Sequence, residues 1–162
     1  MDPEARRIDL RRVEEILDLQ EGRGRVPLLA DDGIRALFGS ARRIAVVGAS
    51  SRPGRPSRGV FETLARAGYD CVPVNPNEDE VAGVRAYPTL EAAASTGQFD
   101  IVDVFRRSEL CAEHAREAVA IGAGALWLQL GIVSWEAAAI AHEAGLGVVM
   151  DRCTAIELRR LR

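Results

Sequence analysis

The sequence predicts an α/β fold: a Rossmann-like parallel sheet of about five strands, with helices on both faces. Short apolar runs recur five times along the chain, and each is followed by glycine or polar residues. Amphipathic helical patterns separate the runs, and strands that alternate with helices form parallel sheets through right-handed crossovers. The predicted strands cover residues 44–47, 71–74, 99–105, 125–129 and 147–150.

The first strand opens into a loop that predicts a phosphate site. Residues 43–59 read RIAVVGASSRPGRPSRG, and the β-branched run at 44–47 is typical of a strand that is buried on both faces. Gly48 ends this strand and begins a loop of small residues, after which a helix runs to Gly68. Loop amides and a helix N-terminus bind phosphate in nucleotide-binding folds, so we expect a phosphorylated ligand here.

This loop differs from the dinucleotide fingerprint G-x-G-x-x-G, because Ser50 stands where the second glycine is required. Three arginines, Arg52, Arg55 and Arg58, lie in or next to the loop. They favour a ligand that carries more phosphate charge than a pyrophosphate alone, such as an additional ribose phosphate. The alternative interpretation is a solvated basic loop.

Helices are predicted between and around the strands. Thr89 and Ser134 are suited to cap two of them, and Asp31 or Asp32 is suited to cap a short N-terminal helix that ends at Gly39. We expect residues 1–40 to form an N-terminal helical extension packed on the domain, and residues 41–162 to form the ligand-binding domain. Other helices are predicted over residues 4–20, 108–121 and 151–162.

Composition excludes several classes of function. The 162 residues suffice for one domain, and 21 basic against 24 acidic residues argue against nucleic-acid binding. No run approaches the length of a membrane span and the N-terminus is too polar for a signal peptide, so we expect a cytoplasmic protein. Three cysteines without metal-ligand spacing predict neither disulfides nor a metal site.

Ligands of parallel sheets bind beyond the C-terminal ends of the strands, where this chain places small and polar residues. The second strand ends in Asn75, whereas NAD sites usually place an acidic residue there to bind the ribose diol, and this counts against NAD. The other strand ends carry residues 48–50, 105–107, 129–131 and 151–153.

Five motifs in order resemble those of the small bacterial CoA-binding proteins, which are similar to the CoA-binding domain of the succinyl-CoA synthetase α subunit. These motifs are VGAS, PVNP, DIVDVFR, WLQLGI and VVMDRC, and the resemblance covers about residues 25–162. One departure is that Leu158 and Arg159 follow Glu157 where family members often carry a histidine, so no role of that histidine is carried over.

The resemblance implies coenzyme A as the ligand. The pyrophosphate is then expected on the loop, the 3′-phosphate at Arg52 or Arg55, the adenine beside Val74 to Pro76, and the pantetheine along residues 105–107. The strand at residues 127–131 is expected to form the far wall. The predicted CoA-binding residues are Gly48, Ala49, Ser50, Ser51, Arg52, Gly54, Arg55, Pro56, Ser57, Val74, Asn75, Pro76, Phe105, Arg106, Arg107, Gln129 and Gly131.

The sequence identifies no catalytic residues. His114 and His142 lie on apolar helical stripes, and no Ser/His/Asp set follows from spacing. A structural role is favoured for Asp103. Cys153, beside Arg152, is either a thiol that reacts with the CoA thiol or a cysteine packed under the terminal helix.

We therefore expect a protein that binds CoA or a short acyl-CoA without catalysis of its own. Two alternatives stay open: an NAD(H)- or nucleotide-binding regulatory module, and a CoA-binding subunit of an acyl-CoA ligase that requires a partner chain. The expected partner is a small molecule, with neither nucleic acid nor membrane. Protein partners and homo-oligomers are left open.

Overall fold

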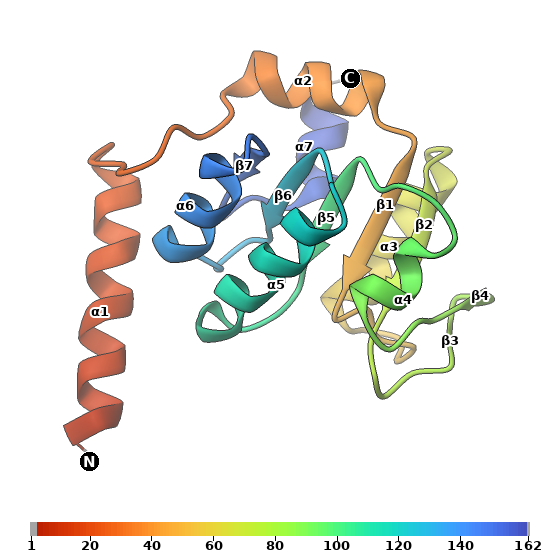
Figure 1. The fold of residues 1–162 in the computed structure, drawn as a ribbon, viewed down its shortest axis with the longest axis horizontal. Helices are drawn as coiled ribbons and strands as arrows, with labels where there is room; N and C mark the ends of the chain where they lie inside the picture. The colour runs from red at the N-terminus through yellow and green to blue at the C-terminus, as the bar shows by residue number, and fades with distance from the viewer. Residues whose placement is uncertain (1–2, 162) are drawn as a thin grey trace.

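A computed structural model of the protein describes residues 3–161 and contains the predicted five-stranded parallel sheet (Figure 1). All pairings in this sheet are parallel, which confirms the predicted fold class. The third strand along the sheet is shorter than the predicted 99–105 range. In spatial order the strands are β2 (Asp70–Val74), β1 (Arg43–Val47), β5 (Ile101–Val104), β6 (Ala125–Leu128) and β7 (Gly147–Val149).

Helices cover both faces of the sheet because its strands are apolar on both sides. Within β1, Ala45 and Val47 belong to one core cluster, whereas Ile44 and Val46 belong to the other. Such continuous apolar strands are typical of parallel sheets. The first face is covered by α4 (Leu90–Ala94), α5 (Ser108–Ala120) and α6 (Trp135–Glu143), and the second by α2 (Asp31–Ser40), α3 (Pro56–Arg66) and α7 (Thr154–Leu161).

Two of the predicted helix caps are confirmed and one is wrong. The hydroxyls of Thr89 and Ser134 each accept a hydrogen bond from a backbone N–H of the following helix, at 3.1 Å in both cases. Helix α2 begins at Asp31 itself, with Ala30 as its N-cap and no side-chain cap, and continues one residue beyond Gly39 to Ser40. Neither Asp31 nor Asp32 is therefore the N-cap, because both lie within the first turn.

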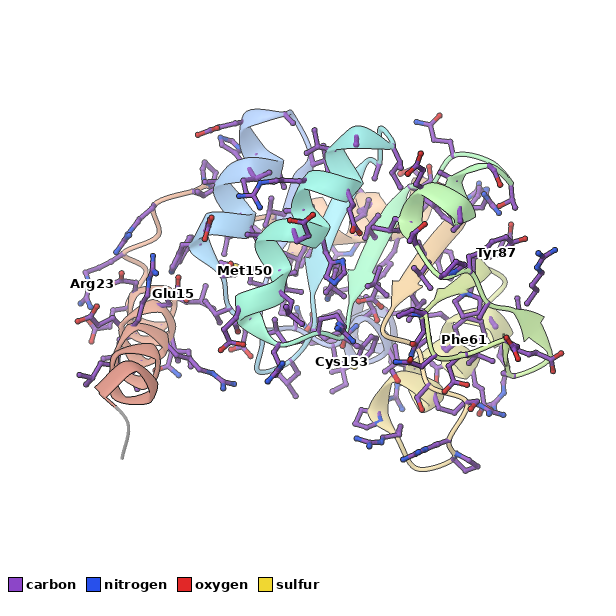
Figure 2. All side chains as sticks on the ribbon, turned by 60° about the horizontal axis from the view of Figure 1, so that its bottom comes forward. Glu15, Arg23, Phe61, Tyr87, Met150 and Cys153 are labelled. Atoms are coloured by element: carbon purple, nitrogen blue, oxygen red, sulfur yellow. The ribbon has the colours of Figure 1, made fainter. Side chains whose placement is uncertain are left out.

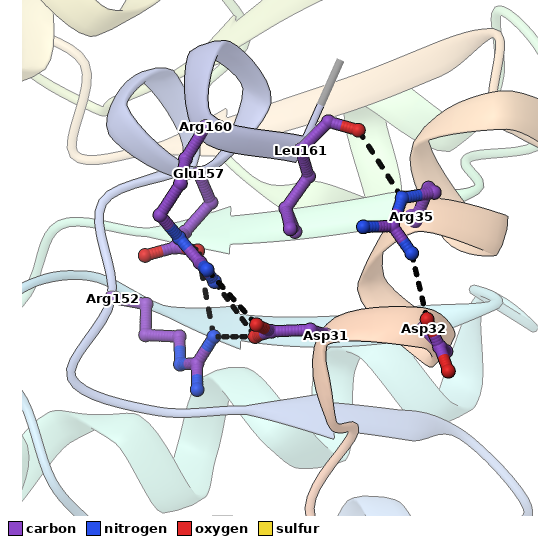
Figure 3. A network of polar contacts seen from close by, with 7 residues as sticks. All are labelled: Asp31, Asp32, Arg35, Arg152, Glu157, Arg160 and Leu161. Atoms are coloured by element: carbon purple, nitrogen blue, oxygen red, sulfur yellow. Dashed lines mark hydrogen bonds and ion pairs between the residues drawn. The ribbon is translucent and has the colours of Figure 1, made fainter.

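Asp31 instead joins α2 to the end of the chain (Figure 3). Its carboxylate accepts hydrogen bonds from Arg152 Nη1 at 2.9 Å and from Arg160 Nη2 at 2.7 Å. Glu157 contacts the same two arginines, at 3.4 Å and 2.7 Å. Two carboxylates and two guanidinium groups thus hold α2 against α7.

A short hairpin follows β2 and protects the edge of the sheet. Strands β3 (Glu80–Val81) and β4 (Val84–Arg85) pair antiparallel, with Gly83 in the turn between them. After the hairpin, Tyr87 donates its N–H to the Pro73 carbonyl at 3.0 Å and accepts from the Asn75 N–H at 2.9 Å. These bonds use backbone groups of the edge strand that are otherwise open to another chain.

The two N-terminal helices pack differently. Helix α1 (Pro3–Gln20) stands beside α6 at the side of the domain (Figure 1), and Ile16 and Leu19 pack on its core. Helix α2 is more deeply integrated, since its Ile34 and Phe38 are buried in the core under the sheet. The division of the chain at residue 40 stays a prediction.

Candidate functional site

An open cleft lies where the path of the chain changes direction across the sheet. From β1 the chain passes to β2 on one side and later crosses to β5 on the other, so the loops after β1 and β5 lead to opposite sides. A crevice at this point is the general ligand site of doubly wound sheets. The cleft has a volume of about 450 Å³ and is lined by Gly48, Ser50, Arg52, Arg55, Pro56, Ser57, Asn75, Asn77, Glu78 and Phe105.

Gly48 lies where the ends of β1 and β5 meet, and the backbone conformation there requires glycine. Its φ is +83°, and a Cβ atom built on it would lie 2.5 Å from the carbonyl oxygen of Phe105. Its N–H donates to the carbonyl of Val74 at 2.8 Å. A side chain here would therefore separate the ends of β1 and β5, apart from any effect on a ligand.

The loop after β1 uses several of its amides internally. Ser57 Oγ accepts from the Ser50 N–H at 3.1 Å, and Ser50 Oγ accepts from the Arg52 N–H at 3.1 Å. Glu78 accepts from the Ser51 N–H at 3.0 Å. The Ser57 N–H, in the first turn of α3, has no partner among residues 3–161. The N–H groups of Ser50, Ser51 and Arg52 are therefore already used within the protein.

Arginine side chains supply the positive charge of the cleft. Arg52 and Arg55 are exposed and line it, and within the described chain neither guanidinium has an ion pair or a hydrogen bond. Arg58 differs, because it donates to Glu62 at 2.6 Å and to the carbonyl of Ser51 at 2.6 Å. Of the three arginines that the sequence singled out, two line the cleft and the third holds the loop in place.

The end of β2 forms the opposite wall. Asn75 Nδ2 donates to the carbonyl of Ala49 at 2.9 Å, and its Oδ1 accepts from the Asn77 N–H at 2.9 Å. The Asn75 amide therefore ties the loops after β1 and β2 together, while the Val74 side chain is buried. Asn77 and Glu78 line the cleft without having been predicted, although they follow β2 at the same edge.

Glu78 is an anion within this otherwise basic cleft. Hydrogen bonds from Ser51, followed by the nearby charge of Arg52, lower the pKa of its carboxyl group below the ordinary value. Glu78 is therefore ionised at neutral pH, and it holds the loop after β1 by accepting a hydrogen bond from the Ser51 N–H. An anionic ligand would meet two arginines and one carboxylate.

Several other predicted residues lie at the same edge of the sheet but do not line the cleft. Phe105 lines it, whereas Arg106 and Arg107 follow Phe105 toward α5. The Arg106 Cδ atom adjoins Gly48, and its Nε is buried without a partner among the described residues. Gly131 donates its N–H to Asp151 Oδ1 at 2.7 Å.

Gln129 is buried in a polar network between β5, β6 and α7. Its Nε2 donates to Asp103 Oδ1 and to Thr154 Oγ1, both at 2.7 Å, and the Thr154 hydroxyl donates to Asp103 Oδ2 at 3.0 Å. Burial raises the pKa of Asp103 to about 7, against the opposing effect of these hydrogen bonds. The Gln129 amide thus serves the fold, and its contact with a ligand stays a prediction.

The cysteines differ in their surroundings. Burial raises the pKa of the Cys71 and Cys111 thiols to about 12, so neither is a thiolate at neutral pH. Cys153 is half-buried at the start of α7 (Figure 2), and the neighbouring Arg152 guanidinium binds Asp31 and Glu157. The reactivity of Cys153 therefore stays a prediction.

The described range, residues 3–161, was compared with the requirements of a metal site and of a membrane-spanning helix, and it meets neither. It contains no group of three or more His, Cys, Asp or Glu side chains placed to hold a metal ion. None of the helices in this range combines the length and the apolar character that crossing a membrane requires.

A doubly wound parallel sheet with a basic, glycine-containing cleft at its switch point defines a nucleotide-binding type of domain. Comparison with known proteins makes this class specific. The model of the CoA binding domain family matches residues 42–159, and the chain belongs to that family. This confirms the resemblance drawn from the five sequence motifs.

The chain is also similar to individual proteins over most of its length. The uncharacterized protein YneT of Bacillus subtilis is 42% identical over 120 residues, which are 74% of this chain and 87% of YneT. A solved hypothetical protein from Pyrococcus horikoshii has 37% identity and a TM-score of 0.77, covering 82% of this chain and 92% of that one. A solved Thermus thermophilus protein has 38% identity and the same TM-score, covering 83% and 100%.

A larger protein contains the same fold as one part. The dinucleotide-forming acetyl-coenzyme A synthetase 1 of Ca. Korarchaeum cryptofilum has 23% identity and a TM-score of 0.58, covering 67% of this chain and 26% of that one. At this identity the match establishes the shared fold alone.

Proposed function

We propose that the cleft between the ends of β1, β2 and β5 binds coenzyme A or a short acyl-CoA, and that binding is the function of this chain. The observation that carries the proposal is that, in a member of the CoA binding domain family, Arg52 and Arg55 line the cleft and their guanidinium groups pair with no described residue. Guanidinium groups form strong, charge-assisted hydrogen bonds with phosphate.

The parts of CoA can be assigned to this edge of the sheet in order. The pyrophosphate lies at the loop of residues 48–57, with the Ser57 N–H at the start of α3 as a donor. The 3′-phosphate lies at Arg52 or Arg55. The adenine lies against residues 74–77, and the pantetheine follows residues 105–107 toward Gly131.

The end of β2 supports CoA over NAD. Asn75 stands where an NAD site places a carboxylate for the ribose diol, and its amide is bonded to Ala49 and Asn77. A 3′-phosphorylated ribose has no free 3′-hydroxyl for such a carboxylate, and it adds a dianion that an arginine recognises. Ligands that differ only at this phosphate therefore test the proposal.

The test is calorimetric titration with CoA, dephospho-CoA, NAD and ATP. We expect CoA to bind most tightly. Arg52→Ala and Arg55→Ala should together weaken CoA by about tenfold or more, because a charge-assisted hydrogen bond contributes on the order of 1.5–3 kcal/mol. The same variants should affect dephospho-CoA less.

Arg66→Ala is the matched control, because Arg66 is an exposed arginine of α3 outside the cleft and the substitution removes the same charge. It should leave the affinity for CoA unchanged. Tighter binding of NAD or ATP than of CoA would refute the proposal. Equal losses of affinity for CoA and dephospho-CoA would show that the two arginines do not recognise the 3′-phosphate.

A further inference from the structure

Arg106 is a half-buried arginine that has no partner among the described residues. It follows β5 at the edge of the sheet where the cleft lies. Its Nε atom is buried and unbonded among residues 3–161, and its side chain forms no ion pair with any of them. A buried donor without a hydrogen bond costs stability, and a charged donor costs more than a neutral one. Such a group in a folded protein requires an explanation.

The other half-buried arginines of the described chain each pair with a carboxylate. Arginine is seldom buried without such a pair, so these three follow the usual pattern. The pairs, with their N···O distances, are Arg43–Asp70 at 2.6 Å, Arg58–Glu62 at 2.6 Å and Arg152–Asp31 at 2.9 Å. Within residues 3–161 the fold supplies no counter-ion for Arg106, and an anionic ligand would supply one.

The side chain of Arg106 lies against the start of the loop after β1. Its Cδ atom is 3.1 Å from the position that a Cβ atom on Gly48 would occupy. Gly48 lines the cleft, so the stem of Arg106 packs beside the cleft. Arg52 and Arg55 line the cleft later in the same loop, just before α3 begins. The three arginines are therefore divided between the two ends of this loop.

The charges that line the cleft fall short of the charge of CoA. Arg52, Arg55 and the ionised Glu78 are the charged side chains of the lining, and they sum to a single positive charge. CoA carries one negative charge on each phosphate of its pyrophosphate, and the 3′-phosphate adds about −1.5 to −2. When Arg52 and Arg55 bind the 3′-phosphate, the lining leaves no cation for the pyrophosphate.

We propose that Arg106 binds the pyrophosphate of CoA beside Gly48, while Arg52 and Arg55 bind the 3′-phosphate. This inference rests on the proposed CoA-binding function and refines it, because the sequence placed Arg106 along the pantetheine. A guanidinium group forms charge-assisted and bidentate hydrogen bonds with phosphate oxygens. Arg106 then recognises the diphosphate that CoA shares with dephospho-CoA, and the other two arginines distinguish these ligands.

Arg106→Met tests the assignment, because methionine keeps an unbranched stem beside Gly48 and lacks the guanidinium group. The variant should bind CoA and dephospho-CoA about tenfold or more weakly, by the same factor, since both ligands contain the pyrophosphate. The combined Arg52→Ala and Arg55→Ala variant should instead weaken CoA more than dephospho-CoA. Arg106→Lys should lose less affinity than Arg106→Met, because it retains a charge without the planar fork.

Phosphorus NMR of the CoA complexes identifies the phosphate that each side chain contacts. The 3′-phosphate and the pyrophosphate give separate resonances. At saturating CoA, Arg106→Met should move the pyrophosphate resonances from their positions in the unsubstituted complex and leave the 3′-phosphate resonance in place. The combined Arg52→Ala and Arg55→Ala variant should do the reverse.

Two controls separate binding from folding. Arg106→Met removes a buried donor that is unpaired among the described residues, so without ligand it should melt no lower than the unsubstituted protein. Arg116→Met is the matched control, because Arg116 is an exposed arginine of α5 outside the cleft. It should leave the affinities for both ligands unchanged.

The outcomes distinguish this inference from the proposed function. An unsubstituted protein that binds neither CoA nor dephospho-CoA would overturn both. An affinity for CoA that Arg106→Met leaves unchanged, or a loss of affinity with unmoved pyrophosphate resonances, would overturn this inference alone. A loss confined to CoA would also overturn it and assign Arg106 to the 3′-phosphate. An Arg106→Met protein that melts lower without ligand, or does not fold, would overturn it by assigning the guanidinium group to the fold.

Discussion

At the scale of single residues, polar side chains near the strand ends mainly hold backbone and neighbours in place. Asn75 bonds to Ala49 and Asn77, Glu78 bonds to Ser51, and Gln129 bonds to Asp103 and Thr154. These side chains position the loops, whereas Arg52 and Arg55 line the cleft without an ion pair or a side-chain hydrogen bond among residues 3–161. The sequence predicted where the strands of the sheet end, because apolar runs mark them. The sequence could not show which polar side chains bond to neighbouring loops and which do not, since this depends on which groups meet in the folded chain.

Asp103 gives a prediction about pH. Its pKa is raised to about 7 by burial, so the folded protein binds a proton that the unfolded chain releases near pH 4. The stability contribution of this protonated group is full below about pH 4 and declines as pH rises toward 7. The decline amounts to at most about 4 kcal/mol, since each pKa unit corresponds to 1.36 kcal/mol.

Asp103→Asn keeps the size of the side chain and removes the titration. Urea unfolding of this variant from pH 4 to pH 7 should show a smaller loss of stability with rising pH than the unsubstituted protein shows. A second variant, Thr154→Val, removes one hydrogen bond to Asp103 but keeps the carboxyl group, so its pH dependence should persist. Identical pH profiles for Asp103→Asn and the unsubstituted protein would contradict the assignment.

At the scale of elements, α2 and α7 are held together by charges from distant parts of the chain. The sequence predicted both helices but assigned Asp31 or Asp32 to capping, because an aspartate before an apolar pattern is a common N-cap. The partners Arg152 and Arg160 are more than one hundred residues away, so local pattern could not identify them. Hydrogen bonds from Arg160 and Arg152 hold the pKa of Asp31 well below its usual range.

Asp31→Asn should lower the melting temperature at neutral pH, and added salt should reduce the difference because the group is solvent-accessible. The control is Asp32→Asn, which removes an equal charge from the same helical turn but loses only one pair, with Arg35. Since the folded pKa of Asp31 is depressed, its contribution is present above the unfolded pKa and fades as pH falls. Equal melting temperatures for the two variants at low salt would show that the network does not stabilise the protein.

At the scale of the whole molecule, the strand order decides where the cleft lies. Five apolar runs and the helices between them were enough to predict the parallel sheet, because burial on both faces leaves a strong signal. The order β2-β1-β5-β6-β7 places the ends of β1 and β5 at the switch point. Gly48 and Phe105 meet there although 57 positions separate them in the sequence. The close approach of Phe105 to Gly48 results from the strand order, and no local sequence motif predicts it.

Gly48 is therefore required by the sheet, and the proposed CoA site adds a second requirement that can be tested beside it. Gly48→Ala combines a positive φ with a Cβ atom 2.5 Å from the Phe105 carbonyl oxygen. We expect it to lower the free energy of unfolding by about 2 kcal/mol or more, as measured by urea titration. Gly122→Ala is the control, since Gly122 has φ +68° and no atom of the described residues lies within 4 Å of its Cβ position, and it should lose only about 1–2 kcal/mol.

The affinity for CoA completes this comparison. Gly48→Ala should lose both stability and CoA binding, because displacing Phe105 opens the cleft, whereas Arg52→Ala should lose binding with its stability retained. Gly122→Ala should keep its affinity despite its lower stability, since Gly122 lies outside the cleft. If Gly48→Ala is no less stable than Gly122→Ala, the contact with Phe105 is relieved at little cost. The glycine would then matter only for the ligand that approaches it.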